Sequence, residues 1–234
     1  MEFSKISAPT LKELFVQELE HMILSGRLAV GDKLPPERDL AQSMQVSRAV
    51  VNAGICELAR LGFLTIRPRI GTFVADYRRN GTTETLVSIM NYNGGRLRED
   101  EIRSILELRI AMDSMAVKLC IPRITETELD SLGNYVAQLE KTSSMSEAAE
   151  LAFSFQHELA FLSGNTLMPL IFFSFRAPIL SLWERFCLLY GIETLYQNTS
   201  ILYHLIRQRD TEKAISFLTE IIQDTINGDH PVYY

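Results

Sequence analysis

The sequence predicts a small α+β winged helix-turn-helix domain followed by an all-α helical bundle, so that the chain is predominantly α overall. Three observations lead to this fold class. Residues 31–74 change from helical to β-type patterns and end in a short hairpin. No β-type pattern follows Val74, and apolar residues then recur at helical spacing to the end of the 234 residues. A hydrophobic content of 47% excludes a disordered chain and allows each domain its own core.

Two helices and a turn are marked by residues that commonly start and end helices. Pro35-Pro36 before an acidic residue predicts a helix start, because proline is tolerated in the first turn and a carboxylate there interacts with the positive end of the helix dipole. The stretch 45–47 predicts the turn, and the hydroxyl of Ser47 is placed to cap the next helix. That helix is expected over 48–61, with Gly62 ending it in the left-handed conformation.

A β-hairpin is expected after this helix, and another helix before the pair. The β-prone runs 63–66 and 72–74 flank the basic sequence 67–71, which predicts two short strands with a charged tip. Apolar residues at helical spacing over 11–23 predict a first helix that braces the helix-turn-helix. These elements together are typical of a winged helix-turn-helix, whose last helix enters the DNA major groove. Double-stranded DNA is therefore the expected partner.

The candidate DNA contacts lie near the turn and at the hairpin tip. Arg48 follows the turn, where a recognition helix meets base edges, and arginine with guanine is the commonest specific pairing. Arg67 and Arg69 flank the tip and suit a phosphate or the minor groove. The alternative is that these arginines are ordinary solvated charges. The full candidate set is Arg38, Ser47, Arg48, Ala49, Asn52, Arg67, Arg69 and Gly71.

The charge distribution agrees with DNA binding once the chain is divided. The net charge is −6, but residues 1–79 hold 11 Lys/Arg and 9 Asp/Glu, whereas residues 80–234 hold 12 and 20. The balances are thus +2 and −8. Phosphate contacts need local positive charge and not a basic whole protein. An excess this small predicts weak non-specific affinity, so we expect binding as a homodimer to a palindromic operator.

The polar stretch that follows the hairpin predicts a domain boundary. We expect the DNA-binding domain over residues 1–76, a linker over 77–84 and an all-α domain for ligand binding and dimerisation over 85–234. A loop is expected at 91–96, and a capping box at Thr125 and Glu128. The helices expected after the linker are 85–90, 99–119, 125–140, 146–162, 168–190, 193–209 and 211–227.

Several other classes of protein are disfavoured. No apolar run approaches the roughly 18 residues of a membrane span, and no signal-peptide pattern opens the chain, so a cytoplasmic protein without membrane contact is expected. Cys56, Cys120 and Cys187 are isolated in apolar helical patterns, which favours small buried side chains. No nucleophile with a nearby base and no phosphate-binding glycine loop is evident, so neither an enzyme nor a cofactor is expected.

The chain resembles the GntR superfamily of bacterial transcription regulators, in its fatty-acid-regulator (FadR) branch. The N-terminal motifs are LPPERDLA at 34–41, VSR at 46–48 and LARLGFLTIRPRIGTFV at 58–74. LELR at 106–109 and FLSGN at 161–165 extend the resemblance into the second half. There are two departures from the family pattern. Asn52-Ala53 stands where the family usually has Arg-Glu, and Arg69 stands where it usually has glycine, so the resemblance implies a different operator sequence and a more basic hairpin tip.

The resemblance also raises the question of a metal site, because many relatives hold a metal with one Asp and three His. Matching the motif at 163–165 places His157 at the first His position and Phe153 at the Asp position. Counting from Asp210 places Thr199 and Ile221 at the other two His positions. Three of the four ligands are then missing, so no metal is expected.

An anionic effector is implied instead. Arg109 lies in an apolar helical pattern, and the resemblance directs this arginine toward an effector cavity, with His157 as a second contact. The alternatives are a buried ion pair for Arg109 and a satisfied core histidine for His157. The residues Phe172, Phe173, Phe175, Phe186 and Trp183 would line an apolar cavity, a dimer interface or plain core.

The sequence therefore predicts a DNA-binding transcription regulator whose operator affinity is controlled by a small anionic effector, such as an acyl-CoA or a carboxylic acid. The first alternative is a metal-free regulator of sugar-acid or amino-acid metabolism. A second is an enzyme-like helical domain with a DNA-binding appendage. A third, raised by Asn52 and Ala53, is an interaction protein that has lost DNA binding.

Overall fold

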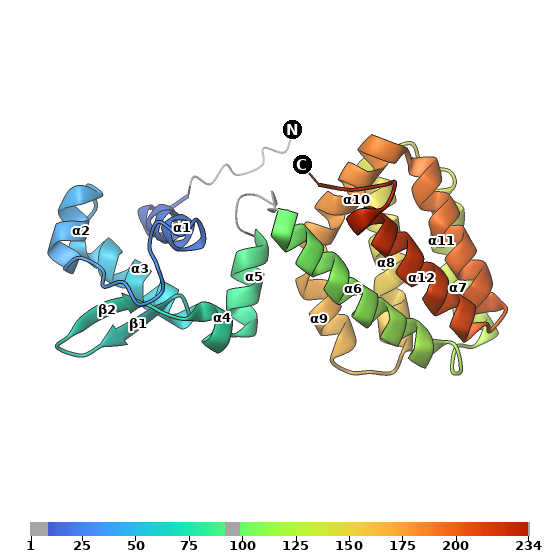
Figure 1. The fold of residues 1–234 in the computed structure, drawn as a ribbon, viewed down its shortest axis with the longest axis horizontal. Helices are drawn as coiled ribbons and strands as arrows, with labels where there is room; N and C mark the ends of the chain where they lie inside the picture. The colour runs from blue at the N-terminus through green and yellow to red at the C-terminus, as the bar shows by residue number, and fades with distance from the viewer. Residues whose placement is uncertain (1–8, 92–98, 234) are drawn as a thin grey trace, which may run out of the picture. The chain divides into compact units, whose positions relative to one another are not determined.

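The structure is a computed structural model that describes residues 9–91 and 99–233 (Figure 1). The chain divides into two compact units, Met1–Tyr92 and Asn93–Tyr234. A winged helix-turn-helix occupies the first unit, and helices alone form the secondary structure described in the second, as the sequence predicts.

The first unit contains helices and one two-stranded antiparallel hairpin. Its elements are α1 (Leu11–Leu24), α2 (Glu37–Ser43), α3 (Arg48–Arg60), β1 (Leu64–Arg67), β2 (Gly71–Val74), α4 (Tyr77–Asn80) and α5 (Thr83–Asn91). The core forms where α1 crosses α3, and Phe15 and Leu58 are both fully buried there. Gly54 makes this close approach possible, because a Cβ atom at Gly54 would lie 2.2 Å from the Phe15 ring. Larger side chains at this point would push the two helices apart.

Local signals set the ends of these helices. The Ser47 hydroxyl accepts the Val50 amide at 3.2 Å and caps α3, which confirms the predicted cap. Gly62 follows the helix with a φ of +82°, as expected for a left-handed cap. A capping box between Thr10 and Glu13 opens α1 and had not been predicted.

Most of the expected linker over residues 77–84 is helical in the structure. Asp76 caps α4, and α5 begins at Thr83. The hydroxyl of Thr85 donates to the carbonyl of Leu61 at 2.6 Å, and Ser88 hydrogen-bonds to Glu20 of α1. These contacts make α5 part of the first unit. The second unit accordingly begins at residue 93 rather than 85. The predicted loop at 91–96 lies outside the described residues apart from Asn91, which ends α5.

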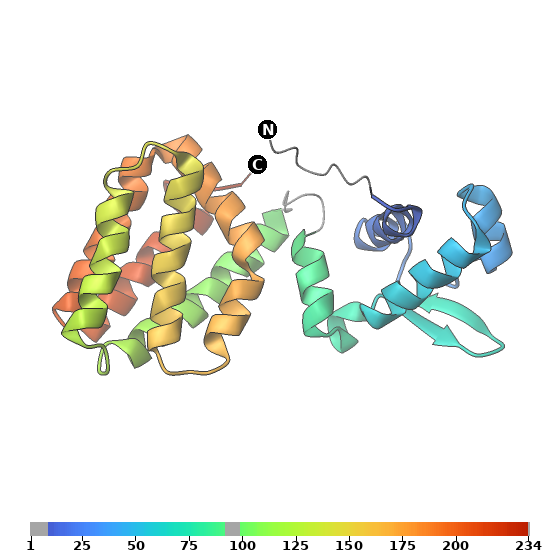
Figure 2. The same cartoon turned by 180° about the vertical axis from the view of Figure 1, so that it is seen from behind.

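The second unit is a bundle built around the helix α8. The described helices are α6 (Glu99–Cys120), α7 (Glu126–Leu139), α8 (Met145–Leu162), α9 (Met168–Ser174), α10 (Arg176–Tyr190), α11 (Ile192–Arg207) and α12 (Thr211–Asn227). Helix α8 contacts α6, α7 and α10, and Figure 2 shows α7 and α8 side by side. Buried alanines such as Ala148, Ala152 and Ala160 allow these neighbours to approach α8 closely. The predicted caps at Thr125 and Asp210 are confirmed.

The single helix expected over 168–190 is wrong, because the chain breaks between α9 and α10. Phe175 ends the first helix and precedes the second. Pro178 explains the break, since it has no N–H to donate to the carbonyl of Ser174 and its ring would clash with that carbonyl in a continuous helix. In α10 the same proline occupies the first turn, where no such bond is needed.

Two of the three cysteines are buried, as predicted. Burial raises the thiol pKa of Cys120 to about 12 and that of Cys187 to about 11, so both remain thiols at neutral pH. Cys56 is exposed, contrary to the expectation, because it lies on the outer face of α3.

The buried carboxyl of Glu20 leads to a stability prediction. Burial raises the pKa of Glu20, and the hydrogen bond from Ser88 opposes that rise only in part. A carboxyl with a raised pKa binds its proton more tightly in the folded state, so stability is lost as the pH rises from the ordinary pKa through the folded one. We expect Glu20→Gln to increase amide protection of α1 and α5 at pH 7 and to change it little at pH 4. Hydrogen–deuterium exchange measures both. Lower protection at pH 7 would show that the Ser88 bond needs the carboxylate.

Candidate DNA-binding surface and effector cavity

The N-terminal end of α3 presents a polar face to solvent. Arg48, Ala49 and Asn52 are all exposed, and Ser47 caps the helix beside them. The four residues predicted to meet DNA here therefore share one end of one helix. A helix N-terminus also carries partial positive charge, which favours a phosphate next to Ser47.

Asn52 is held by the preceding helix. Its side-chain amide donates to the Glu37 carboxylate of α2 at 3.1 Å. This bond orients the amide in the absence of DNA, and an adenine pairing with Asn52 would have to replace or share it. Arg38, also on α2, is 81% exposed and lies 3.5 Å from Asp39, a distance at which an exposed ion pair contributes little. Its guanidinium is thus available for a phosphate.

The hairpin forms the predicted basic wing. Strand pairing runs from Leu64 opposite Val74 to Arg67 opposite Gly71. The guanidinium of Arg67 lies 4.7 Å from the Phe73 ring centre, so a cation–π contact holds it at the wing surface. Arg69 is exposed at the tip with a φ of +64°, the conformation for which glycine is usually selected.

A third basic residue of the wing had not been predicted. Lys33 pairs through its backbone with Phe73, and its ammonium lies 5.9 Å from the Phe73 ring centre. Its side chain also covers Gly71, where a Cβ atom would lie 2.6 Å from the lysine Cε atom. Gly71, with a φ of +138°, thus fits a structural role beneath Lys33. Lys33 is far from β2 in sequence, so only the pairing of the segment before α2 with β2 reveals it.

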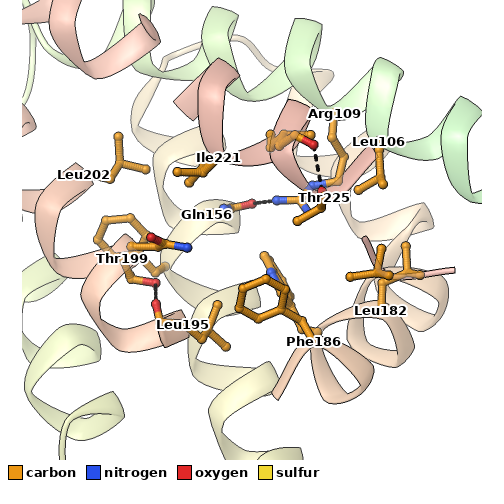
Figure 3. A pocket seen from close by; sticks show the side chains of 15 residues that line it. Leu106, Arg109, Gln156, Leu182, Phe186, Leu195, Thr199, Leu202, Ile221 and Thr225 are labelled. Carbon is orange, nitrogen blue, oxygen red and sulfur yellow. Dashed lines mark hydrogen bonds between the residues drawn. The ribbon is translucent and has the colours of Figure 1, made fainter. Parts of the chain in front are cut away.

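The second unit contains a small cavity among its helices (Figure 3). Its volume is about 60 Å³. The lining comes from α6, α8, α10, α11, α12 and the segment after α12. It consists of Leu106, Arg109, Phe155, Gln156, Leu182, Trp183, Phe186, Leu195, Asn198, Thr199, Leu202, Ile221, Ile222, Thr225 and Val232.

Among the residues that the structure describes, Arg109 is the one cationic side chain that lines this cavity. Only 6% of the residue is exposed. Its Nη2 atom donates to Asp113 at 3.1 Å and to Gln156 at 2.5 Å, and its guanidinium lies 4.6 Å from the Trp183 ring centre. Within the described part of the chain, its Nε atom is buried without a hydrogen-bond partner. Arg109 therefore forms a buried ion pair, which was the alternative expected from the sequence, and it also lines the cavity.

Asp113 belongs to the same buried pair, one helical turn after Arg109. Burial raises the pKa of this carboxyl, and the Arg109 cation counters part of the rise. A ligand carboxylate beside Arg109 would supply further negative charge to its guanidinium.

The polar side of the cavity comes mainly from Gln156, which Figure 3 shows pointing toward Arg109. Thr199 also lines the cavity, but its hydroxyl already donates to the carbonyl of Leu195 at 2.8 Å. Asn198 and Thr225 complete the polar lining. The remaining walls are apolar, a combination suited to a small molecule with one acidic end.

His157 does not line this cavity. Its ring stacks on Phe153 at a centroid distance of 5.6 Å, and its Nε2 atom is 3.1 Å from the carbonyl of Pro169. The structure places the preceding residue of α8, Gln156, in the cavity lining in its stead. One position along a helix turns a side chain by roughly 100°.

The aromatic residues proposed as a cavity lining separate into three groups. Trp183 and Phe186 line the cavity. Phe172 and Phe175 are buried but do not line it, and Phe173 is 57% exposed. The break before α10 explains the split, because α9 presents its aromatic residues to a different part of the bundle.

Thr199 and Ile221, two of the positions considered for metal ligands, line the cavity, but neither is a metal-binding residue. Among the residues that the structure describes, no group of three or more His, Cys, Asp or Glu side chains is arranged to hold a metal ion. In the same residues, no helix is both long and apolar enough to cross a membrane.

Comparisons with known proteins extend over both units. LutR, an HTH-type transcriptional regulator of Bacillus subtilis, is 26% identical over 63% of this chain and 65% of its own length. A fatty acid metabolism regulator protein of Shewanella pealeana is 30% identical over 66% of this chain and 63% of its own. The chain thus spans less than two thirds of these curated relatives.

One solved structure shows the same fold. It is titled for Lar, which "controls the expression of the Listeria monocytogenes agr system and mediates virulence", and it matches with a TM-score of 0.63. The match covers 94% of this chain and 97% of that one, at 15% identity.

The family models assign both units. The model described as "Bacterial regulatory proteins, gntR family" matches residues 11–74, and the FCD domain model matches residues 104–224. The first contains the exposed end of α3 and the wing, and the second contains most of the cavity. The chain therefore belongs to the bacterial regulatory proteins of the gntR family and carries an FCD domain.

Proposed function

We propose that this regulator acts in the cytoplasm as a homodimer that binds a palindromic operator, and that a small carboxylic acid in the α6–α12 cavity controls its affinity for DNA. The observation that carries the effector half of the proposal is the buried guanidinium of Arg109, a residue that lines an otherwise mainly apolar cavity. A carboxylate is the ligand group that best complements such a guanidinium.

The DNA half of the proposal rests on the exposed end of α3 and the wing. Arg48 is suited to a guanine and Asn52 to an adenine in the major groove. Arg38 and the wing cations Lys33, Arg67 and Arg69 would contact phosphates or the minor groove beside it. Two copies related by a two-fold axis would read two inverted half-sites, which is why a palindrome is expected.

The size of the cavity favours a small acid over an acyl-CoA. The cavity volume is about 60 Å³. A carboxylate with a few further atoms fits this space without rearrangement, whereas an acyl chain would require several side chains to move. The relatives named for fatty acid metabolism therefore do not decide the effector of this chain. Gln156 and Asn198 add polar groups that suit a hydroxy or amino acid, which favours the sugar-acid or amino-acid alternative.

The first prediction tests the recognition helix. Arg48→Ala should weaken binding to the operator by about 1–3 kcal/mol and relax the base preference at one position of each half-site. Lys12→Ala is the matched control, because it removes one positive charge from the same unit but at a residue paired with Glu57, toward the other end of α3. Selection of operator sequences by each variant, followed by titration, measures both effects. Equal losses of operator affinity in the two variants would mean that Arg48 contributes only its positive charge and no base recognition.

The second prediction tests the cavity. Removing Arg109 alone would leave Asp113 buried and unpaired, at a cost of about 3–5 kcal/mol. We therefore expect the double variant Arg109→Met with Asp113→Asn to stay folded and bind the operator but to lose its response to small carboxylates. Asp113→Asn alone keeps the guanidinium and should still respond. Thermal shift and operator binding, each with a panel of carboxylates, decide the outcome. A response retained by the double variant would place the effector elsewhere.

The third prediction concerns metal content. Gln156, Thr199 and Ile221 reach the cavity from three helices, and none of them is a good ligand for a transition metal. We expect elemental analysis of protein purified without chelator or affinity tag to find no stoichiometric zinc, nickel or manganese. About one such ion per chain would mean that residues beyond those assigned here form a metal site.

A further inference from the structure

The segment after α12 closes one side of the cavity. Among the lining residues, Val232 alone lies outside a helix, and it is 2% exposed. Figure 1 shows this segment turning back from the end of α12 toward α10. The other lining side chains are positioned by helix packing, whereas the position of Val232 depends on what holds a short extended segment.

Helix α10 holds the segment by its backbone carbonyls. The guanidinium of Arg185 donates to the carbonyls of Val232 and Tyr233, with Nε–O distances of 3.0 and 3.1 Å. The hydroxyl of Tyr190 donates to the carbonyl of Pro231 at 2.7 Å. Three consecutive residues are thereby fixed against α10, and Val232 is the middle one.

Helix α12 holds the same segment from the other side. The Asp224 carboxylate accepts the Asp229 amide at 2.7 Å and lies 2.5 Å from the Nδ1 atom of His230. The Val232 amide lies 3.4 Å from the carbonyl of Thr225, itself a cavity residue. Pro231 restricts the backbone between these contacts. The segment is thus attached to both α10 and α12, and Val232, which lies between these attachments in the chain, lines the cavity.

We infer that residues 229–233 form one wall of the effector cavity and that Val232 limits the size of the acid that this chain accepts. The inference rests on the proposed function, because it assumes that the acid binds beside Arg109. A wall made of one side chain on a non-helical segment can change without disturbing helix packing. Removing the two methyl groups of Val232 would make room for about two more ligand carbons.

The experiment compares full-length wild-type protein with Val232→Ala and Val232→Ile. The probes are straight-chain carboxylates from acetate to octanoate, and dissociation constants are measured by calorimetry or thermal shift. We expect wild type to prefer short acids, Val232→Ala to prefer acids one or two carbons longer, and Val232→Ile to prefer shorter ones. One methylene in an apolar pocket changes affinity by about 10-fold or more, so each shift is measurable.

Val136→Ala is the matched control, because Val136 is a buried valine of α7 that does not line the cavity. It should lower stability without changing the preferred length. The inference is overturned if wild type binds acids and both Val232 variants keep its length preference. If wild type binds no carboxylate, the proposed effector class falls together with the inference. Should Val232→Ala fail to fold, the shift toward shorter acids in Val232→Ile still decides the question.

Discussion

The buried charge of Arg109 is the constraint on which the second unit depends. An isolated cation in a protein interior is strongly unfavourable, so every residue around it must supply compensation. Asp113 does so from the next turn of α6, Gln156 from α8 and the ring of Trp183 from α10. Three helices therefore meet at one guanidinium. Among the described residues its Nε atom still has no hydrogen-bond partner, so the hydrogen-bonding capacity of Arg109 is not fully used there.

The first unit depends on a different constraint, the close crossing of α1 and α3. Glycine within a helix costs about 0.5–1 kcal/mol relative to alanine, yet Gly54 allows the Phe15 ring to pack directly on the backbone of α3. The same helix carries the exposed DNA-facing end. Helix α5 is tied to the far end of α3 through Thr85 and through the ion pair of Arg60 with Glu84, with atoms 2.5 Å apart. Helix α5 precedes α6 in the chain. A conformational change that propagates along the backbone from Arg109 on α6 would therefore reach α5 before α3.

Features with a local cause could be predicted from the sequence, and features with a tertiary cause could not. The caps at Ser47, Gly62 and Thr125 each depend on a few adjacent residues, and all three are present. Asp113 could have been found as well, because a carboxylate four residues after an arginine lies on the same helix face.

Lys33 and Gln156 mark the limit of such reasoning. The position of Lys33 depends on pairing with a strand about forty residues later in the chain, which no local pattern reveals. Gln156 was missed because one position along a helix turns a side chain by roughly 100°, and the local pattern does not show which of two adjacent polar residues faces a cavity. The break at Phe175 has a local cause that was overlooked. Pro178 is evident in the sequence, but the apolar residues on both sides of it continue the helical pattern and favoured one uninterrupted helix.

The small cavity also limits how an effector can act. Moving a two-state equilibrium from 1:99 to 99:1 requires a difference in binding free energy of about 5.5 kcal/mol. The best small ligands gain at most about 1.5 kcal/mol per non-hydrogen atom, so an acid with four or five such atoms has at most about 6–7.5 kcal/mol in total. Nearly all of that free energy would have to be specific to one state. A contact made equally in both states contributes nothing, so apolar burial alone is insufficient. The charged contact with Arg109 is the interaction strong enough to carry the difference, and it would do so only if its surroundings differ between the two states.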